Sequence, residues 1–191
     1  SSVRLETPGA ILFTSGTTGE PRPAVLRHRN LLASATAWNA VLRPAGTDVW
    51  LATVPLSHVA GLGIVLRAAL EGLPVIVHER FDPEAVLRDL GEAAVSHISL
   101  VPTQLRRVLE AAGRSAIRAP ALRALLLGGA PIPAELVREA AGRGLPVVPT
   151  YGLTEAASGV TALAPKDAAA HPDSVGTALP GFRIGIVRAD G

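Results

Sequence analysis

Short apolar runs alternate along the chain with longer stretches that are apolar on one face only. The short runs are rich in Val, Leu and Ile, a pattern typical of strands buried on both faces. Strands are therefore predicted at 10–14, 24–26, 49–54, 74–78, 98–101, 125–127, 146–148 and 182–187. Helices are predicted at 31–42, 61–70, 83–92, 102–112 and 134–141. This alternation predicts an α/β fold, a mostly parallel sheet flanked by helices on both faces.

Residues that begin and end helices support several of these boundaries. We expect Asn30 to cap the helix at 31–42, and Asp82, followed by Pro83, to cap the helix at 83–92. Gly72 is expected to close the helix at 61–70. The stretch at 164–174 is rich in Pro, Asp and Ala and is expected to form a flexible loop.

The composition describes a chain with a sizeable aliphatic core. Hydrophobic residues make up 48% and charged residues 18%, which excludes a disordered chain. Aromatic residues are only 3%, too few for a surface that stacks the bases of single-stranded nucleic acid. The net charge is +2 and the arginines are not clustered, so no nucleic-acid partner is expected. The tryptophans, Trp38 and Trp50, are expected in the core.

The absence of cysteine excludes disulfides, thiolate nucleophiles and Cys-ligated zinc, and it is compatible with a cytoplasmic location. The apolar stretch at 59–70 is too short to span a membrane and carries Arg67, so no membrane span is expected. Methionine is also absent. We therefore expect the 191 residues to be one partial domain, the central segment of a longer protein. No metal-ligand spacing relates His28, His78, His97 and His171.

The loop after the first predicted strand has the sequence TSGTTGEPR, from Thr14 to Arg22. Its two glycines allow close approach to the backbone, and free N–H groups and hydroxyls together form a cradle for phosphate oxygens. The loop matches neither the Walker A motif nor the dinucleotide-binding GxGxxG motif. We interpret it as a phosphate-binding loop, the alternative being an ordinary surface loop.

Three further loops follow predicted strands, where ligands bind in open α/β sheets. In PLSHVAG, from Pro55 to Gly61, His58 is a candidate to contact an acid or to gate its tunnel, the alternative being a histidine bonded to the backbone. The glycines of 128–131 allow a planar group to lie against the backbone, or simply form a tight turn. In YGLTE, from Tyr151 to Glu155, a hydroxyl and a carboxylate can hold a phosphate oxygen and Mg²⁺ together; the alternative is a solvated turn.

Taken in this order, the four loops resemble those of the adenylate-forming superfamily, which includes acyl-CoA synthetases, luciferases and the adenylation domains of peptide synthetases. FTSGTTGEPR is similar to its phosphate loop, YGLTE to a second core motif, and SVGTALPG, at 174–181, to a further signature. The resemblance implies that the chain is part of a large N-terminal domain. It also implies that the ATP phosphates are wrapped by Thr14, Ser15, Gly16, Thr17, Thr18 and Gly19.

By the same resemblance, Gly129, Ala130 and Pro131 border the adenine and Tyr151 stacks on it. Thr154 binds the α-phosphate, and Glu155 binds Mg²⁺. Two positions depart from the pattern, because Arg22 stands where most members have Lys and Pro23 where many have Gly. We therefore assign Arg22 no essential role.

Within the superfamily, the stretches 55–72, 97–109 and 125–155 most resemble o-succinylbenzoate–CoA ligases of menaquinone biosynthesis. The resemblance implies a ligase that uses ATP, Mg²⁺ and CoA and has His58, Thr103 and Ser158 near the acyl substrate. An acid with two carboxylates needs a polar partner for the one that does not react. No unpaired lysine is present, so Arg, Ser, Thr or His must supply that partner.

The resemblance also implies that parts of the enzyme lie outside this chain, namely the portion before the phosphate loop and a mobile C-terminal subdomain with a catalytic lysine. We therefore expect the 191 residues alone to be inactive. Two alternatives stay open: a ligase for another aryl or fatty acid, and a non-catalytic module that keeps the fold. A homo-oligomeric state is also left open.

Overall fold

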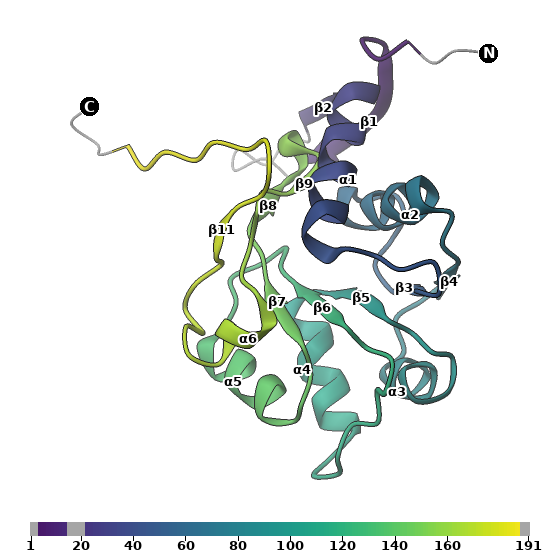
Figure 1. Ribbon diagram of the computed structural model, residues 1–191, viewed down its shortest axis with the longest axis vertical. Coiled ribbons are helices and arrows are strands. Elements are labelled where there is room, and N and C mark those ends of the chain that lie inside the picture. Colours follow the sequence, from purple (N-terminus) through teal and green to yellow (C-terminus); the bar gives the residue numbers. More distant parts are fainter. Residues whose placement is uncertain (1–3, 15–21, 188–191) are drawn as a thin grey trace.

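The computed structural model describes residues 4–14 and 22–187, and a five-stranded sheet forms its centre (Figure 1). The strand order is β4–β3–β5–β6–β7, and every pairing in this sheet is parallel. The strands are β3 (Trp50–Ala52), β4 (Val75–Val77), β5 (His97–Leu100), β6 (Ala124–Leu127) and β7 (Val147–Pro149). The predicted α/β class and the parallel sheet are therefore confirmed.

Helices cover both faces of this sheet, as predicted (Figure 1). One face is covered by α1 (His28–Leu42) and α2 (Val59–Glu71), and the other by α3 (Pro83–Glu92), α4 (Pro102–Ala111) and α5 (Ala134–Gly142). The strand β6 shows the pattern, because Leu126 packs with the first layer while Leu125 and Leu127 pack with the second. Successive side chains of a strand point to opposite faces, so a strand between two helical layers is apolar throughout.

Helix ends agree with the sequence where the signal is local. The Asp82 side chain accepts a hydrogen bond from the Glu84 N–H at 3.0 Å, and Gly72 ends α2 with φ of 65°. The prediction for α1 was wrong, because the helix starts at His28 and its N-cap is Arg27. Asn30 lies inside the first turn, where its side-chain oxygen accepts a hydrogen bond from the Arg27 N–H at 3.0 Å. The side chain therefore supports the helix start from the third position rather than from the cap.

Three two-stranded ribbons surround the central sheet, all antiparallel. The first pairs β1 (Pro8–Thr14) with β2 (Arg22–Arg27), which confirms the first two predicted strands. The second pairs β8 (Gly152–Leu153) with β9 (Ser158–Gly159) around the short helix η1 (Thr154–Ala156). The third pairs β10 (Thr161–Ala162) with β11 (Thr177–Ala178). The second ribbon lies at the carboxyl ends of the central strands, and the third lies beside the starts of β5 and β6.

Two predictions near the end of the chain were wrong. The stretch 164–174 contains the helix α6 (Pro165–Ala168), and Ala168 is fully buried. Residues 182–187 form no strand, and Ile186 is 98% exposed. The alternating pattern of 182–187 is that of a strand, but a strand forms only where a neighbour accepts and donates its backbone hydrogen bonds. No described segment provides that neighbour.

The strand order locates the place where a ligand is expected. The chain runs from β3 to β4 at one edge, then returns to the other side of β3 and continues through β5, β6 and β7. In open α/β sheets, the carboxyl ends at such a reversal border the ligand-binding crevice. Among the described residues, no helix is long and apolar enough to cross a membrane.

Candidate active site

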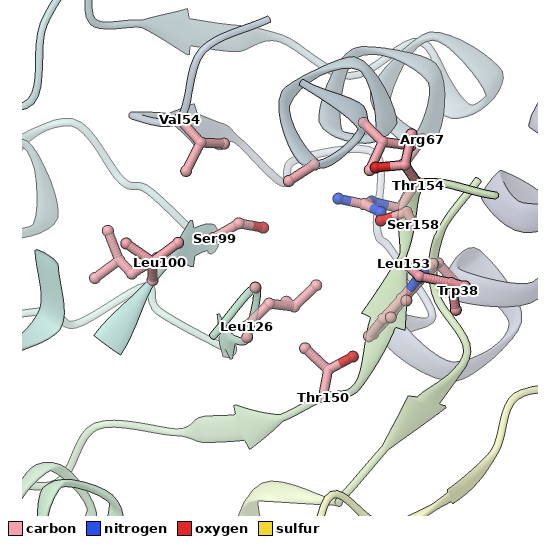
Figure 2. A pocket seen from close by; sticks show the side chains of 17 residues that line it. Trp38, Val54, Arg67, Ser99, Leu100, Leu126, Thr150, Leu153, Thr154 and Ser158 are labelled. Carbon is pink, nitrogen blue, oxygen red and sulfur yellow. The ribbon is translucent and has the colours of Figure 1, made fainter. Parts of the chain in front are cut away.

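A cavity of about 220 Å³ lies at the carboxyl ends of the central strands (Figure 2). One wall is formed by Val54, which follows β3, and by Ser99 and Leu100 of β5. Leu126 of β6 and Thr150, which follows β7, lie at the base of the view. The cavity therefore occupies the crevice that the reversal of strand order creates.

The opposite wall carries Arg67, Thr154 and Ser158 (Figure 2). Arg67 is 2% exposed, and none of the ion pairs among residues 4–14 and 22–187 includes it. Burial lowers the pKa of Arg67 to about 9, so the guanidinium remains charged at neutral pH. Its Nε has no hydrogen-bond partner among the described residues. The cavity thus presents a buried cation that no described anion neutralises.

Arg67 was not predicted as a site residue; in the sequence it counted only as a charge that argues against a membrane span. It stands on the inner face of α2, where Gly61, Gly63, Ile64 and Ala68 are also buried. A Cβ at Gly63 would approach Arg67 Nη1 at 3.2 Å and Ser158 Oγ at 3.5 Å. The glycine therefore leaves room for the guanidinium and the hydroxyl. An arginine amid small and apolar residues of a helix was the signal in the sequence.

The segment 154–158 is a strained turn next to the cavity. Ala157 has φ of 59° and Ser158 has φ of 117°, both outside the range that side-chain-bearing residues prefer. The Ser34 hydroxyl of α1 donates a hydrogen bond to the Ala157 carbonyl at 2.8 Å, and both residues are buried. This contact fixes the turn against α1, with Thr154 and Ser158 on the cavity wall and Glu155 exposed.

A second hollow of about 390 Å³ adjoins the first, and both are lined by Gly129, Thr150 and Gly152. It contains three of the residues that the resemblance assigns to the adenine, namely Ala130, Pro131 and Tyr151. The Tyr151 side chain is 54% exposed, so its ring is available to a planar group. The structure therefore brings together the residues of two predicted loops, 128–131 and 151–155.

The glycines at 128 and 129 have a local structural cause. A Cβ at Gly128 would lie 2.8 Å from the Thr150 carbonyl oxygen, and Gly129 has φ of 80°. Both positions therefore require glycine for the turn itself. This turn nevertheless leaves the backbone of 129–131 open on the side of the second hollow.

Two predicted substrate residues do not line either hollow. His58 is exposed at the start of α2, where its N–H donates to the Pro55 carbonyl at 3.0 Å. Its neighbour Val59 does line the cavity, as does Val101, which lies two residues before the exposed Thr103. His58 and Thr103 thus stand beside the rim rather than in the wall. Ser158 is the predicted substrate residue that lies in the wall itself.

The predicted phosphate loop falls mostly outside the described residues, because Ser15, Gly16, Thr17, Thr18 and Gly19 lie between 14 and 22. Thr14 ends β1, and its hydroxyl donates to the Arg22 carbonyl at 3.3 Å. The hairpin that carries the loop packs against the strained turn, since Leu26 of β2 and Ala157 belong to one buried cluster. The loop therefore starts from an element that contacts the 154–158 turn.

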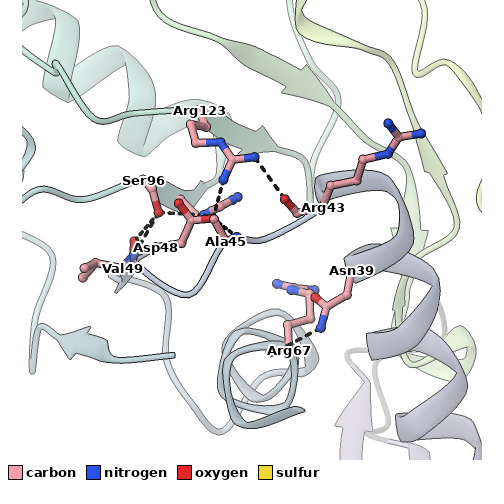
Figure 3. A network of polar contacts seen from close by, with 9 residues as sticks. Asn39, Arg43, Ala45, Asp48, Val49, Arg67, Ser96 and Arg123 are labelled. Carbon is pink, nitrogen blue, oxygen red and sulfur yellow. Dashed lines mark hydrogen bonds and ion pairs between the residues drawn. The ribbon is translucent and has the colours of Figure 1, made fainter. Parts of the chain in front are cut away.

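A polar network links the segment 43–49, between α1 and β3, to the residues at the start of β5 and β6 (Figure 3). Asp48 accepts hydrogen bonds from Arg123 and from the Ala45 N–H, and Ser96 bonds both to Val49 and to His97 Nδ1. Burial would raise the pKa of Asp48, but its hydrogen bonds from Ala45 and Arg123 outweigh this and lower it. Burial lowers the pKa of His97 to about 4, so the imidazole is neutral at pH 7.

No three His, Cys, Asp or Glu residues within 4–14 and 22–187 are arranged to hold a metal ion. A resident metal centre is therefore not built from the described part of the chain. Glu155, next to the Thr154 hydroxyl, offers one carboxylate. That donor set fits Mg²⁺ brought in by a nucleotide, since Mg²⁺ is commonly held by one or two carboxylates together with substrate phosphates.

Comparisons with known proteins match the whole length of the chain. The family model of AMP-binding enzymes matches residues 1–191. A 2-succinylbenzoate–CoA ligase of Enterococcus faecalis is 38% identical over 186 residues, which are 96% of this chain and 38% of that protein. The chain therefore spans little more than a third of that relative.

Two solved structures of o-succinylbenzoate CoA synthetase from Bacillus subtilis superpose closely on the fold. The complex with the acyl-adenylate intermediate OSB-AMP has a TM-score of 0.91, and the complex with ATP and magnesium ion has one of 0.90. Each is 32% identical to this sequence and covers 97% of this chain and 38% of the other. The described fold is therefore one that holds nucleotide in these relatives.

Proposed function

Because this chain belongs to the AMP-binding enzyme family, we propose that it is the nucleotide-binding core of an AMP-forming acid–CoA ligase acting on o-succinylbenzoate. In this proposal the chain is the central part of a longer enzyme and forms part of one of its domains. Two facts support the choice of reaction. The Enterococcus faecalis relative is named a 2-succinylbenzoate–CoA ligase. The Bacillus subtilis enzyme binds both ATP with magnesium and an acyl-adenylate.

The observation that carries the choice of substrate is Arg67. An otherwise largely apolar cavity holds a buried guanidinium without a described counter-ion, and an isolated buried charge is expensive. An acid with an apolar body and a second carboxylate satisfies this cavity, because a guanidinium binds a carboxylate through two parallel hydrogen bonds. A fatty acid or benzoate offers no second carboxylate for Arg67.

The two adjoining hollows suit a two-part ligand. The acid occupies the cavity beside Arg67 and Ser158, and the adenine occupies the hollow of Ala130, Pro131 and Tyr151. The shared wall of Gly129, Thr150 and Gly152 then lies where the acid and the α-phosphate meet. Thr154 lines the cavity and is the proposed donor to an α-phosphate oxygen. The remaining phosphates are assigned to the 14–19 loop.

The reaction has two steps. First, a carboxylate oxygen of the acid attacks the α-phosphorus of ATP, the bond to the pyrophosphate oxygen breaks, and pyrophosphate leaves. Then the thiol of CoA attacks the acyl carbon, AMP leaves, and the thiol proton is released. The contribution of this chain is positioning, because Arg67 and the apolar walls fix the acid while Thr154 fixes the α-phosphate. Mg²⁺, when bound at Glu155, neutralises charge on the phosphates.

The proposal extends to the setting of the enzyme. ATP and CoA are the proposed co-substrates, so we place the enzyme in the cytoplasm, where both are available. Of the alternatives, a ligase for another aryl or fatty acid leaves the charge of Arg67 without a role. A non-catalytic module leaves the combination of Thr154, Glu155 and Arg67 without one. Neither alternative is favoured by a separate observation.

The test is acid-dependent AMP release by the full-length enzyme with ATP, Mg²⁺ and CoA. The panel is o-succinylbenzoate, 4-oxo-4-phenylbutanoate, which lacks the ring carboxylate, benzoate and a medium-chain fatty acid. We expect o-succinylbenzoate to be preferred and Arg67→Gln to lower its kcat/KM roughly 30-fold or more, as loss of one partner of a buried charge pair does. The exposed Arg106→Gln on α4 is the matched control.

Each other outcome points to an alternative. Preference for benzoate or the fatty acid would replace the substrate and keep the chemistry. The non-catalytic module would be favoured if none of the acids supports AMP release and the Glu155→Gln substitution leaves the behaviour of the protein unchanged.

A further inference from the structure

Both tryptophans of the chain contact the same guanidinium. Arg67 Cζ lies 4.9 Å from the ring centroid of Trp50 and 5.5 Å from that of Trp38. Trp38 stands on α1 and Trp50 on β3, the two elements that directly precede α2 in the chain, and both converge on one side chain of α2. Both tryptophans are 1% exposed. The chain thus concentrates its two largest aromatic side chains around the one arginine that is buried among residues 4–14 and 22–187.

The contact addresses a specific physical problem. A guanidinium in an apolar cavity has lost its hydration, and no ion pair among the described residues replaces it. Glu71, one turn further along α2, accepts a hydrogen bond from Asn39 at 3.0 Å instead of pairing with Arg67. The negative face of an indole attracts a cation, most strongly where water is excluded. Two indole faces therefore stabilise the charge without neutralising it, which leaves it available to a ligand.

Each tryptophan is itself held by neighbours other than Arg67. The Trp50 ring stacks on His97, with centroids 4.8 Å apart, and His97 is bonded to Ser96 in the polar network of Figure 3. Trp38 packs so closely on Gly159 that a Cβ there would lie 2.5 Å from its ring. The next residue, Asn39, donates a hydrogen bond to the Arg67 carbonyl at 3.1 Å, which ties α1 to α2 at this point. The two rings and the backbone of Arg67 are thus fixed relative to one another.

We propose that Trp38 and Trp50 are positioning residues that hold the Arg67 guanidinium at the cavity wall and thereby set the preference for an acid with a second carboxylate. The inference rests on the proposed function and deepens it by adding two residues that determine specificity through Arg67. Without the indole faces the flexible arginine side chain would adopt other rotamers, and the second carboxylate would lose its oriented partner. An acid without that carboxylate would not depend on the orientation.

The experiment compares two acids in the full-length enzyme. The readout is the ratio of kcat/KM for o-succinylbenzoate to that for 4-oxo-4-phenylbutanoate, in wild type, Trp50→Leu, Trp50→Phe and Trp38→Phe. We expect Trp50→Leu to lower the ratio about tenfold, mainly through KM for o-succinylbenzoate, and Trp50→Phe to restore most of it, because a phenyl ring keeps part of the cation–π contact. An equal loss for both acids, with an unchanged ratio, would overturn the proposal, since a purely structural role affects both.

A binding measurement keeps the test independent of folding yield and of turnover. It is made on the 191-residue chain, whose two tryptophans both contact Arg67, so that its intrinsic fluorescence reports on this cavity. In Trp50→Phe, we expect o-succinylbenzoate to change the emission of Trp38, and Arg67→Gln to abolish the change. Emission that responds equally to both acids would contradict the positioning role. A wild-type enzyme that does not distinguish the two acids would instead refute the proposed substrate.

Discussion

Burial lowers the pKa of both ionisable side chains that contact Trp50, Arg67 and His97. Arg67 stays charged at neutral pH although burial lowers its pKa to about 9, whereas burial lowers the pKa of His97 to about 4 and keeps it neutral. Nearby Asp48 partly opposes the loss of charge at His97, while Arg123 and Arg67 favour it. The Trp50 indole therefore contacts one charged side chain, Arg67, and one neutral ring, His97. Protonation of His97 would place a second buried cation in the same cluster.

This arrangement predicts a pH dependence of stability. His97 titrates near 6.5 when unfolded and near 4 when folded, so the unfolded chain binds more protons between these values. Stability from this residue is therefore present above about pH 6.5 and is lost as the pH falls towards 4, by roughly 3 kcal/mol in total. We expect His97→Asn to flatten the slope of the unfolding free energy between pH 6.5 and 4, measured by urea denaturation.

The control for that prediction is a histidine outside the cluster. His171 is exposed, and His171→Asn is expected to keep the wild-type slope. The expectation for His97 fails if its substitution lowers stability equally at every pH, because such a loss would reflect packing rather than proton binding.

Among the elements, α1 has a larger part in the site than its position in the sequence suggests. It carries Trp38 towards Arg67, and its Ser34 hydroxyl holds the turn at Ala157. That turn has two consecutive residues with positive φ, so it needs support from outside. The helix thus stabilises the wall that presents Thr154 and Ser158.

Two buried serines give a matched test of this support. Ser34→Ala leaves the buried Ala157 carbonyl without its donor and is expected to lower the free energy of unfolding by about 1–2 kcal/mol. Ser99→Ala removes a buried hydroxyl that has no partner among the described residues, so we expect a change within about 0.5 kcal/mol. Chemical denaturation of both variants measures the difference. Equal losses would show that the Ser34 hydrogen bond contributes nothing beyond burial.

Local signals explain which elements the sequence predicted correctly. The cap of α3 by Asp82 and the end of α2 at Gly72 depend on adjacent residues, and both predictions are confirmed. The two-residue strands β8 to β11 are too short to leave a periodic pattern, because their pairing is decided by tertiary contacts. For 182–187 the pattern is present but the partner strand is not among the described residues, so a correct local signal gave a wrong element.

The site divides in the same way. The loops after strands identified the region of 128–131 and 151–158, because topology alone places such loops at one edge of the sheet. The apolar helix around Arg67 signalled its burial, but Arg67 was missed because the lack of a counter-ion among the described residues depends on tertiary packing, which the sequence does not show. The contacts of Trp38 and Trp50 with it join three successive elements, α1, β3 and α2, and they depend on how these elements pack, which the sequence pattern does not show.

At the scale of the whole molecule, the described chain contains a complete cavity but also unpartnered apolar surface. On the hairpin of β1 and β2, Leu12 and Leu26 pack inward, while Ile11, Phe13 and Val25 are 53–67% exposed on the other face. The chain spans 38% of the length of its Enterococcus faecalis relative. The residues that line the acid cavity are therefore present in this chain, whereas the complete reaction is carried out in the relatives by a chain more than twice as long.

This difference predicts separate outcomes for binding and turnover. The walls beside Arg67 are formed within residues 38–159, so the 191-residue chain is expected to bind o-succinylbenzoate with a change in tryptophan emission that Arg67→Gln removes. AMP release requires the acid, the α-phosphate and the groups that stabilise its charge to be held together, and a misplacement of about 1 Å costs roughly 100-fold in rate. Because the relatives use a chain more than twice as long, we expect no acid-dependent AMP release from the 191 residues, whereas the full-length enzyme assayed in parallel releases it. Release of AMP by the short chain would mean that the whole catalytic apparatus lies within it, and the positions beyond it would then serve only stability or the transfer to CoA.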